Sequence, residues 1–475
     1  MMAFRPTLFG LAGIFAGCIL YTMPANGAPI FSEEEIAVEV LNPNLAGTYR
    51  AILRTPPQNE KSHIGIFVMH AFGGSANNHV CTGLAVRGYT MLCADTEFMG
   101  REGTYIGYEE HAPAITAGIE YLRENTPGIT TVLLYGRSMG APMMTFYANV
   151  QENGVAACRD PRRIIACDTE NLLDEAGNLK LEPVDGLILG DAHLGDALAT
   201  FTYMDPAVTD HAAPRSRERS LDMYAAENGY PGDEQAAAPH FSGAHYNAEF
   251  LERFLDAQAL RNAKVLNEAL ELWARIEAGD RELYSDGMLM TVPGVEDAAR
   301  IFQADLDLLR CTKRAQIFLT RDGRQDLSDG PVCSVRIPSA RFARADSVSS
   351  MAHIPLRAWL GARALRTTAL YRQTENDLTG IDYESSNTST VANVRGITKP
   401  LLLVANSGHY FIVPNEIVFD SAASADKTFA VTEGAVHAGT PCRNCAEALG
   451  LPPDYYGDTL GRAFDFIDEW IAARF

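Results

Sequence analysis

The feature that most constrains this chain is a serine between two glycines, at the junction of an expected strand and an expected helix. The segment 136–140 reads Gly-Arg-Ser-Met-Gly and follows the apolar run 131–135. Residues 141–144 are small or apolar. This order predicts a strand, a sharp turn at Ser138 and a helix. Backbone segments approach one another closely at such a turn, so a side chain at position 136 or 140 would collide with them.

Ser138 is therefore a candidate nucleophile. The turn would hold its hydroxyl clear of the sheet, at the positive end of the following helix. The short glycine pattern alone also fits an ordinary turn serine. The strand before it and the helix after it favour the nucleophile.

A second glycine-rich loop lies upstream. Residues 64–69 are apolar without alternation, which is typical of a buried parallel strand, and His70-Ala71-Phe72-Gly73-Gly74-Ser75 follows directly. Such a loop can direct a backbone N–H at a developing oxyanion. The alternative is that it only makes the tight turn from strand to helix.

The order of these motifs, with an expected strand at 89–94 between them, resembles the α/β-hydrolase superfamily. The resemblance covers about residues 60–195 and 396–475. It implies that the backbone N–H groups of Phe72 and Met139 form an oxyanion hole, and that a histidine after the last strand acts as the base. The chain departs from the family in having His-Ala where many relatives have His-Gly.

Expected strands and helices alternate along both parts of the resemblance. Strands are expected at 64–69, 89–94, 130–135, 184–189, 400–404 and 427–432, and helices at 77–87, 112–124, 415–424 and 459–473. This alternation predicts an α/β fold with a mostly parallel, doubly wound sheet of the α/β-hydrolase type. One or two further strands are expected within 30–60. Chemistry in such sheets gathers at the carboxyl ends of the strands.

About 200 residues interrupt this pattern. The interval 196–395 predicts a long helix at 247–278, a second helix near 296–310 and a strand at 315–320 that enters a turn. We interpret it as a large, mainly helical cap or lid inserted between late core strands, with the core at 28–195 and 396–475. The alternative is a packing appendage that never contacts substrate.

A serine hydroxyl needs a base that takes its proton and later returns it to the leaving group. His437 follows the last expected strand, where the resemblance places that base. The loop 406–414, which often carries the acid in relatives, has no carboxylate, and Tyr410 stands about where the acid would be.

The acid must therefore come from elsewhere. Asp191 follows the strand at 184–189, at the same sheet edge as Ser138, and is the leading candidate. Glu416 is the alternative, and Asp196, Asp420 or a Ser-His dyad stay open. We expect Asp191 to hydrogen-bond His437 and Glu416 not to do so, because Glu416 lies about ten residues past its strand.

The N-terminus predicts export. Arg5 precedes the apolar run 8–23, and small residues follow at 25–28, which is typical of a secretory signal peptide at 1–27. A lipoprotein anchor at Cys18 is disfavoured because apolar sequence continues beyond it. No other stretch has the length and apolar character of a bilayer span. The protein is expected to be secreted or periplasmic.

Cleavage would leave eight cysteines, an even number that suggests disulfides in an exported protein. Proximity along the sequence favours the pairs Cys81–Cys93, Cys158–Cys167, Cys311–Cys333 and Cys442–Cys445. A redox or metal role for the last pair is the alternative, but a lone CxxC is weak evidence for zinc. The formal net charge of −21 disfavours nucleic acid or an anionic membrane as a partner.

Together these features predict an exported serine hydrolase that cleaves a small-molecule carboxylic ester through a Ser-His-acid triad and an acyl-enzyme. The expected machinery needs no metal and no organic cofactor. An amidase or peptidase, or an acyltransferase, would use the same residues. A catalytically inactive binding protein on a hydrolase scaffold is the alternative outside the enzyme class.

Overall fold

The computed structural model describes residues 20–21, 31–40, 47–99, 107–232, 243–280, 288–296, 298–338 and 350–475. The expected signal peptide and Cys18 lie outside the described residues, except for the two-residue strand β1 (Leu20–Tyr21).

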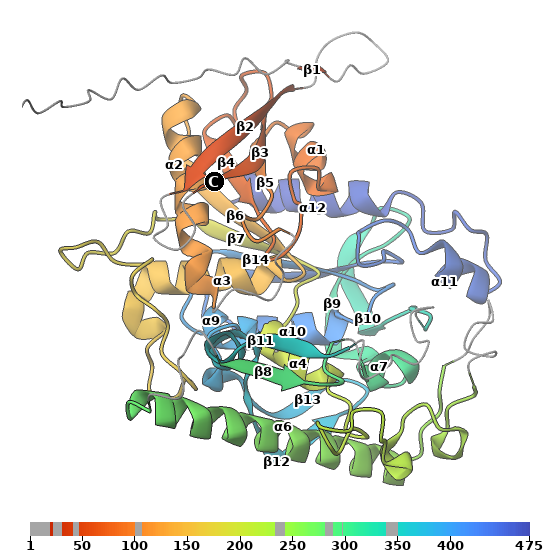
Figure 1. The fold of residues 1–475 in the computed structure, drawn as a ribbon. Helices are drawn as coiled ribbons and strands as arrows, with labels where there is room; N and C mark the ends of the chain where they lie inside the picture. Colours follow the sequence, from red (N-terminus) through yellow and green to blue (C-terminus); the bar gives the residue numbers. More distant parts are fainter. Residues whose placement is uncertain are drawn as a thin grey trace, which may run out of the picture.

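A single large sheet organises the molecule (Figure 1). Its eleven strands are ordered β1-β2-β3-β5-β4-β6-β7-β14-β15-β9-β10. The strands after β1 are β2 (Ser32–Val40), β3 (Gly47–Thr55), β4 (Ile64–Val68), β5 (Thr90–Ala94), β6 (Thr131–Arg137), β7 (Gly186–Gly190), β9 (Cys311–Leu319), β10 (Gln325–Cys333), β14 (Leu401–Asn406) and β15 (Lys427–Thr432). Neighbours from β5 to β9 pair in parallel, and the pairs at both ends are antiparallel.

Helices cover both faces of this sheet, as predicted. Alternate residues of a strand point to opposite faces, so that Leu133 of β6 packs with Phe464 and Leu134 packs with Phe146 in a separate cluster. One face carries α1 (His79–Ala85) and α12 (Thr459–Ala472), and the other carries α2 (Ala112–Asn125), α3 (Gly140–Asn153), α9 (Thr390–Val394) and α10 (Ile412–Ser421).

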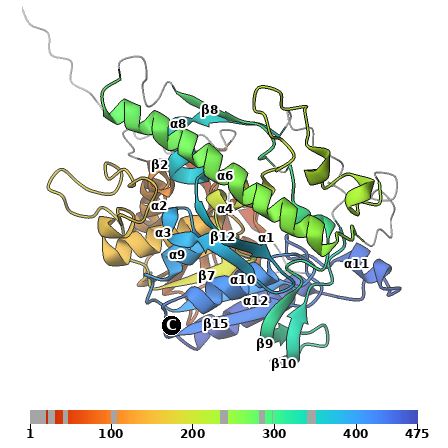
Figure 2. The same cartoon turned by 90° about the horizontal axis from the view of Figure 1, so that it is seen from below.

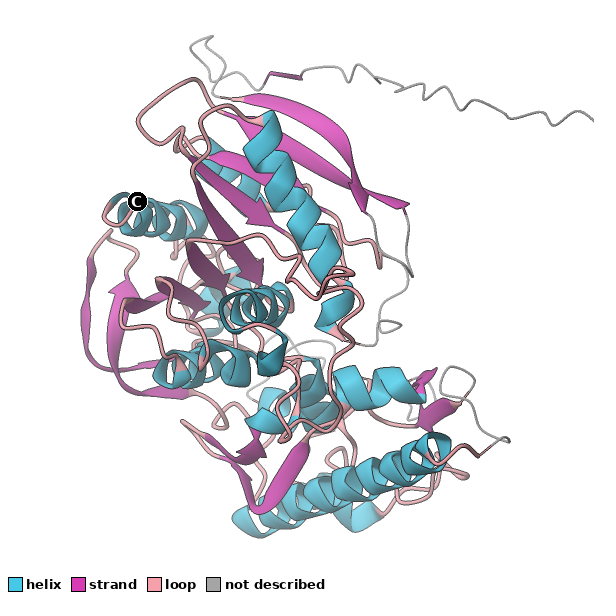
Figure 3. Ribbon diagram, turned by 90° about the vertical axis from the view of Figure 1, so that its left-hand side faces the viewer, coloured by secondary structure: helices cyan, strands magenta, loops and turns pink. Residues whose placement is uncertain are grey.

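The expected cap contains one long helix and two small sheets. α6 (Ala248–Glu277) crosses the molecule on the side away from the large sheet (Figures 2 and 3). Asn247 caps it, with its side-chain oxygen accepting a hydrogen bond from Phe250 N at 2.8 Å. The two small sheets pair β8 (Leu289–Val292) with β11 (Ala352–Pro355), and β12 (Arg366–Gln373) with β13 (Leu378–Asp382). Short helices complete this region: α4 (Asp196–Tyr203), α7 (Ile301–Ala304) and α8 (Leu356–Ala358).

Two features of the interval 196–395 differ from its interpretation as a separate cap. The strand expected at 315–320 is present as β9, but it pairs in parallel with β15 and so belongs to the large sheet. The helix expected at 296–310 is reduced to α7. Asp305 interrupts it by accepting Asp307 N on its side chain at 3.0 Å, and Leu309 has a positive φ of 49° that no helix continues through.

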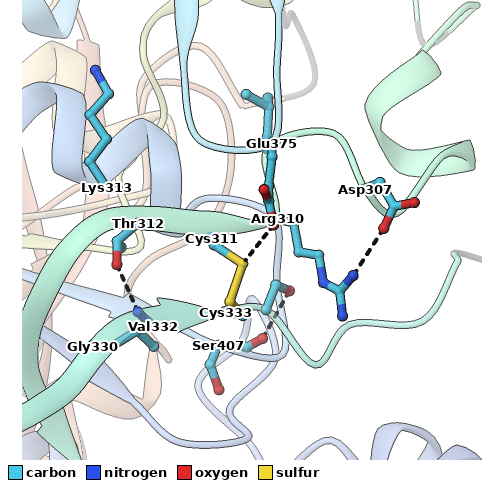
Figure 4. The surroundings of a disulfide bond; sticks show 12 residues. Asp307, Arg310, Cys311, Thr312, Lys313, Gly330, Val332, Cys333, Glu375 and Ser407 are labelled. Atoms are coloured by element: carbon cyan, nitrogen blue, oxygen red, sulfur yellow. Dashed lines mark hydrogen bonds and ion pairs between the residues drawn. A yellow bond between two sulfur atoms is a disulfide. The ribbon is translucent and has the colours of Figure 1, made fainter. Parts of the chain in front are cut away.

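Disulfides join the cysteines in all four predicted pairs. Cys311 and Cys333 stand opposite one another in the hairpin of β9 and β10, whose turn contains Gly323 with a φ of +87°. Figure 4 shows this bond, with Cys311 Sγ 3.4 Å from Glu375 Oε1 and Ser407 close by. The cross-link therefore closes the base of the hairpin at the end that lies next to the loop after β14. No helix in the described part of the chain has the length and apolar character of a membrane span.

Candidate active site

Ser138 stands at a strained turn between β6 and α3. Its φ is +54°, a value that non-glycine residues seldom adopt, and we call this strand-to-helix turn the elbow. Backbone hydrogen bonds hold it there: Ser138 N donates to Gly190 O at 3.1 Å, and Ser138 O accepts His193 N at 3.2 Å. The elbow is therefore tied to the carboxyl end of β7.

The two flanking glycines are required by space, as the sequence predicts. A Cβ on Gly136 would lie 2.6 Å from Gly140 O, and a Cβ on Gly140 would lie 2.6 Å from Met69 O. Both obstacles are backbone atoms, which cannot rotate away. Gly140 therefore packs closely against Met69, at the end of β4, where the glycine-rich loop begins.

His437 and Asp191 meet at the same sheet edge. His437 Nδ1 lies 2.6 Å from Asp191 Oδ2, while the other carboxylate oxygen, Oδ1, accepts Asn406 N at 3.2 Å. Asp191 follows β7 directly with a φ of +43° and is 1% exposed. The carbonyl of His437 accepts Arg137 Nη1 at 2.7 Å, which ties the loop after β15 to the elbow strand.

The surroundings of Asp191 keep its carboxylate ionised. Burial alone would raise its pKa, but the electrostatic attraction of His409, and then the hydrogen bond and charge of His437, outweigh burial and hold the pKa well below its usual range. A carboxylate that stays charged can orient an imidazole and stabilise its protonated form.

The alternative carboxylates have other partners. Glu416 is buried on α10, where Oε2 accepts Lys313 N and Oε1 accepts Gln316 Nε2, both at 2.6 Å. It therefore fastens α10 to β9. Asp420 pairs with Arg314, and Asp196 accepts the Tyr108 hydroxyl at 3.1 Å. Burial raises the pKa of Asp196 to about 7.

A second histidine, which the sequence reasoning missed, also contacts Asp191. His409 lies in the loop that lacks the family's carboxylate, and its Nδ1 is 2.8 Å from Asp191 Oδ2. Its ring stacks on that of His437, with centroids 4.4 Å apart and planes at 27°. The signal available in the sequence was its place: three residues after the end of β14, at the edge that carries Ser138.

The two expected oxyanion donors differ in their surroundings. Met139 N–H, directly before α3, has no acceptor among the described residues. Phe72 N–H donates to His70 Nδ1 at 3.2 Å. Burial, and next the charge of Arg137, lower the pKa of His70 to about 4, so its ring is neutral near pH 7 and can accept that bond.

An apolar pocket lies next to these residues, between segments of the interval 196–395 and the loop after β14. His193, whose backbone N–H binds Ser138 O, lines it together with Phe411, whose ring centroid is 5.4 Å from that of His437. The other lining residues come from α4, α7, α10, the start of β13 and nearby loops: Leu194, Leu198, Thr202, Tyr203, Phe302, Leu309, Leu378, Tyr410 and Pro414.

Asp191, His409 and His437 form the one group in the described chain whose ligand atoms, all within 4.8 Å of one another, could bridge a metal ion. Each histidine nitrogen lies at hydrogen-bond distance from the carboxylate oxygen. His437 Nδ1 makes a hydrogen bond to this carboxylate, whereas His409 Nδ1 has no hydrogen-bond partner among the described residues.

Comparisons with known proteins give likenesses of fold. No family model matches the chain, and no curated protein matches it. Among solved structures, hypothetical protein PA2218 from Pseudomonas aeruginosa is 11% identical, with 99% of this chain and 100% of that one covered and a TM-score of 0.40. Est1E from Butyrivibrio proteoclasticus is 10% identical, with 92% and 98% covered and a TM-score of 0.37. Brefeldin A esterase, described as a bacterial homologue of human hormone sensitive lipase, is 11% identical, with 96% and 82% covered and a TM-score of 0.38.

Likenesses of this size carry no argument about activity. The chain's own architecture defines its class: a mostly parallel sheet with helices on both faces, and a strained serine turn from β6 into α3 at the carboxyl edge. The predicted α/β architecture, a mostly parallel sheet covered by helices on both faces, is confirmed.

The close packing at the elbow predicts that a larger residue there destabilises the protein. We expect Gly140→Ala to lower the free energy of unfolding by about 1–3 kcal/mol, the range for overpacking a filled site, because the new methyl group would meet Met69 O. Gly330→Ala is the matched control, since a Cβ there has nothing within 4 Å. Urea unfolding of both variants tests this, and equal stabilities would contradict the steric account.

Proposed function

We propose that this protein is an exported serine hydrolase that cleaves a carboxylic ester, with Ser138 as nucleophile, His437 as base and Asp191 as the acid of the triad. The observation that carries the proposal is the 2.6 Å contact between His437 Nδ1 and Asp191 Oδ2, at the sheet edge where Ser138 is held at a positive φ. The four disulfides and the N-terminal signal pattern support export.

In the proposed mechanism, Asp191 holds His437 in the tautomer with its proton on Nδ1, which leaves Nε2 to accept the proton of the Ser138 hydroxyl. The serine oxygen attacks the ester carbonyl carbon, and the carbonyl π electrons move to oxygen. When the tetrahedral intermediate collapses, the bond to the alcohol breaks and His437 protonates the leaving oxygen. Water then repeats the sequence on the acyl-enzyme and releases the carboxylic acid.

The oxyanion needs N–H donors where its charge develops. Met139 N–H is the first that we propose, because it precedes α3 and has no acceptor in the described chain. Phe72 N–H is the second. Its present acceptor, the neutral ring of His70, is a weaker acceptor than an oxyanion, so the bond can pass to the substrate when charge develops.

Labelling with a fluorophosphonate tests the nucleophile, because the reagent reacts with an activated serine and not with a structural one. We expect the protein to be labelled at Ser138, and Ser138→Ala and His437→Ala each to lose activity by several orders of magnitude while keeping the fold. The double variant should be little worse than either single one, since triad members act as a unit. An unlabelled Ser138 would favour the inactive binding protein.

The two carboxylates give a matched comparison. We expect Asp191→Asn to lower kcat on a small activated ester by about four orders of magnitude, because the amide favours the wrong tautomer of His437. Glu416→Gln should keep kcat but unfold at a lower temperature, because its partners Lys313 N–H and Gln316 Nε2 both donate and the new amide donates towards one of them. If Glu416→Gln lost kcat and Asp191→Asn kept it, the acid of the triad would be Glu416 on α10.

The apolar pocket predicts substrate choice. We propose that it receives an uncharged, apolar group of the ester. Phe302→Leu should enlarge it and change the ratio of kcat/KM for a bulky apolar ester over an acetate by about fourfold or more, the equivalent of one buried methylene. Leu260→Ala, on the exposed side of α6, is the control. If the ratio changed equally in both variants, the pocket would not be the place where the apolar group of the ester binds.

A further inference from the structure

We infer that Arg137 is a positioning residue of the site: its side chain holds the base, His437, against the strand that carries the nucleophile, Ser138. This inference rests on the proposed function, because it gives Arg137 a part in placing His437 for proton transfer. Arg137 would act through the backbone of the base and not on the ester itself.

His437 lies in a small hairpin after β15, residues 435–441, whose two ends form a β-bridge. We call it the base hairpin. Within it, Val436 N donates to Thr440 O at 2.8 Å, and Gly439 N donates to Val436 O at 2.7 Å. The second bond closes a four-residue turn in which His437 is the second residue. Because these bonds fix the backbone on both sides of His437, a bond to its carbonyl group also sets the position of its ring.

One of the bonds that fasten the base hairpin reaches the nucleophile strand. Asn406 Nδ2, at the end of β14, donates to Val436 O at 2.9 Å and fixes the hairpin to β14. Arg137 Nη1, at the end of β6, donates to His437 O at 2.7 Å. Among the hydrogen bonds of the described residues, this is the one that joins the base hairpin to β6. The distance between base and nucleophile therefore depends on Arg137.

Arg137 also lies beside the strand end that carries the acid. In the parallel pair of β6 and β7, Arg137 stands opposite Gly190, which comes directly before Asp191. Along the chain, Arg137 comes directly before Ser138. One residue thus adjoins all three members of the proposed triad: the nucleophile by a peptide bond, the acid through the register of the two strands, and the base through its guanidinium group.

The glycine at position 190 leaves room for this side chain. A Cβ on Gly190 would lie 2.3 Å from Tyr135 Oη and 3.5 Å from Arg137 Cγ. Because position 190 has no side chain, the stem of Arg137 can cross the end of β7 and reach the loop after β15. Arg137, Tyr135, Asp191 and His437 line one cavity there, so the guanidinium group has open space beside it.

Steady-state kinetics on a small activated ester test the inference. We expect Arg137→Met to lower kcat about ten- to hundredfold with KM little changed, because a catalytic group misplaced by about 1 Å loses rate on that order. Arg137→Lys keeps the charge and a donor and should lose less. Arg366→Met is the matched control and should keep the wild-type kcat: Arg366 Nη1 also donates to a backbone carbonyl at 2.7 Å, that of Arg162, but it lies on β12.

Chemical rescue separates positioning from packing. Arg137→Ala would enlarge the cavity that Arg137 lines, and a free guanidinium ion could donate there to His437 O. We expect guanidinium chloride, at concentrations too low to unfold the protein, to restore much of the kcat of Arg137→Ala. Sodium chloride at equal ionic strength should not restore it, and the wild-type protein should gain nothing from either salt.

Three results would overturn the inference: an unchanged kcat in Arg137→Met, an equal loss in Arg366→Met, or no rescue of Arg137→Ala by guanidinium. The rate of fluorophosphonate labelling gives a readout independent of ester turnover. Arg137→Met should be labelled about tenfold more slowly than the native protein, and equal rates would also count against the inference. Failure of the proposed function is distinguishable, because Ser138 would then resist the reagent in the native protein as well.

Discussion

The buried carboxylate of Asp191 is the constraint on which the rest of the site depends. An ionised carboxylate out of water costs several kcal/mol unless hydrogen-bond donors surround it. Its donors are Asn406 N, at the end of β14, and His437 Nδ1, in the loop after β15. The parallel order β7-β14-β15 brings those carboxyl ends together. The topology of the sheet therefore supplies the donors that the buried carboxylate of Asp191 needs.

The core of this arrangement could be predicted from the sequence because its signals are local. Strands buried on both faces read as unbroken apolar runs, and the glycines of the elbow mark a steric need that the distances at Gly136 and Gly140 confirm. The contact of Asp191 with His437 followed from a general property of parallel sheets, that strand ends share an edge. The same reasoning left Glu416 outside the site, where it binds β9.

Other parts depend on information that a local pattern does not hold. β9 mixes polar and apolar residues without regular alternation, and nothing in them says that it pairs with β15, which lies much later in the chain. The prediction of a helix at 296–310 was wrong because the turn at Asp305 and the positive φ of Leu309 outweigh the helical spacing of the apolar residues. His409 was missed because its contact with Asp191 depends on the register of two loops that meet only in the folded chain.

The loops after β14 and β15 also link the position of the proposed acid, Asp191, to the identity of residue 409. With the acid on β7, a carboxylate at 409 would put a second negative charge within about 3 Å of Asp191, and the pair could not both stay ionised. A histidine at 409, with its Nδ1 2.8 Å from Asp191 Oδ2, avoids this repulsion. The neighbouring Tyr410 and Phe411 then line the apolar pocket while their rings pack against His409. A group bound in that pocket would therefore contact Phe411, whose ring packs against both His409 and His437.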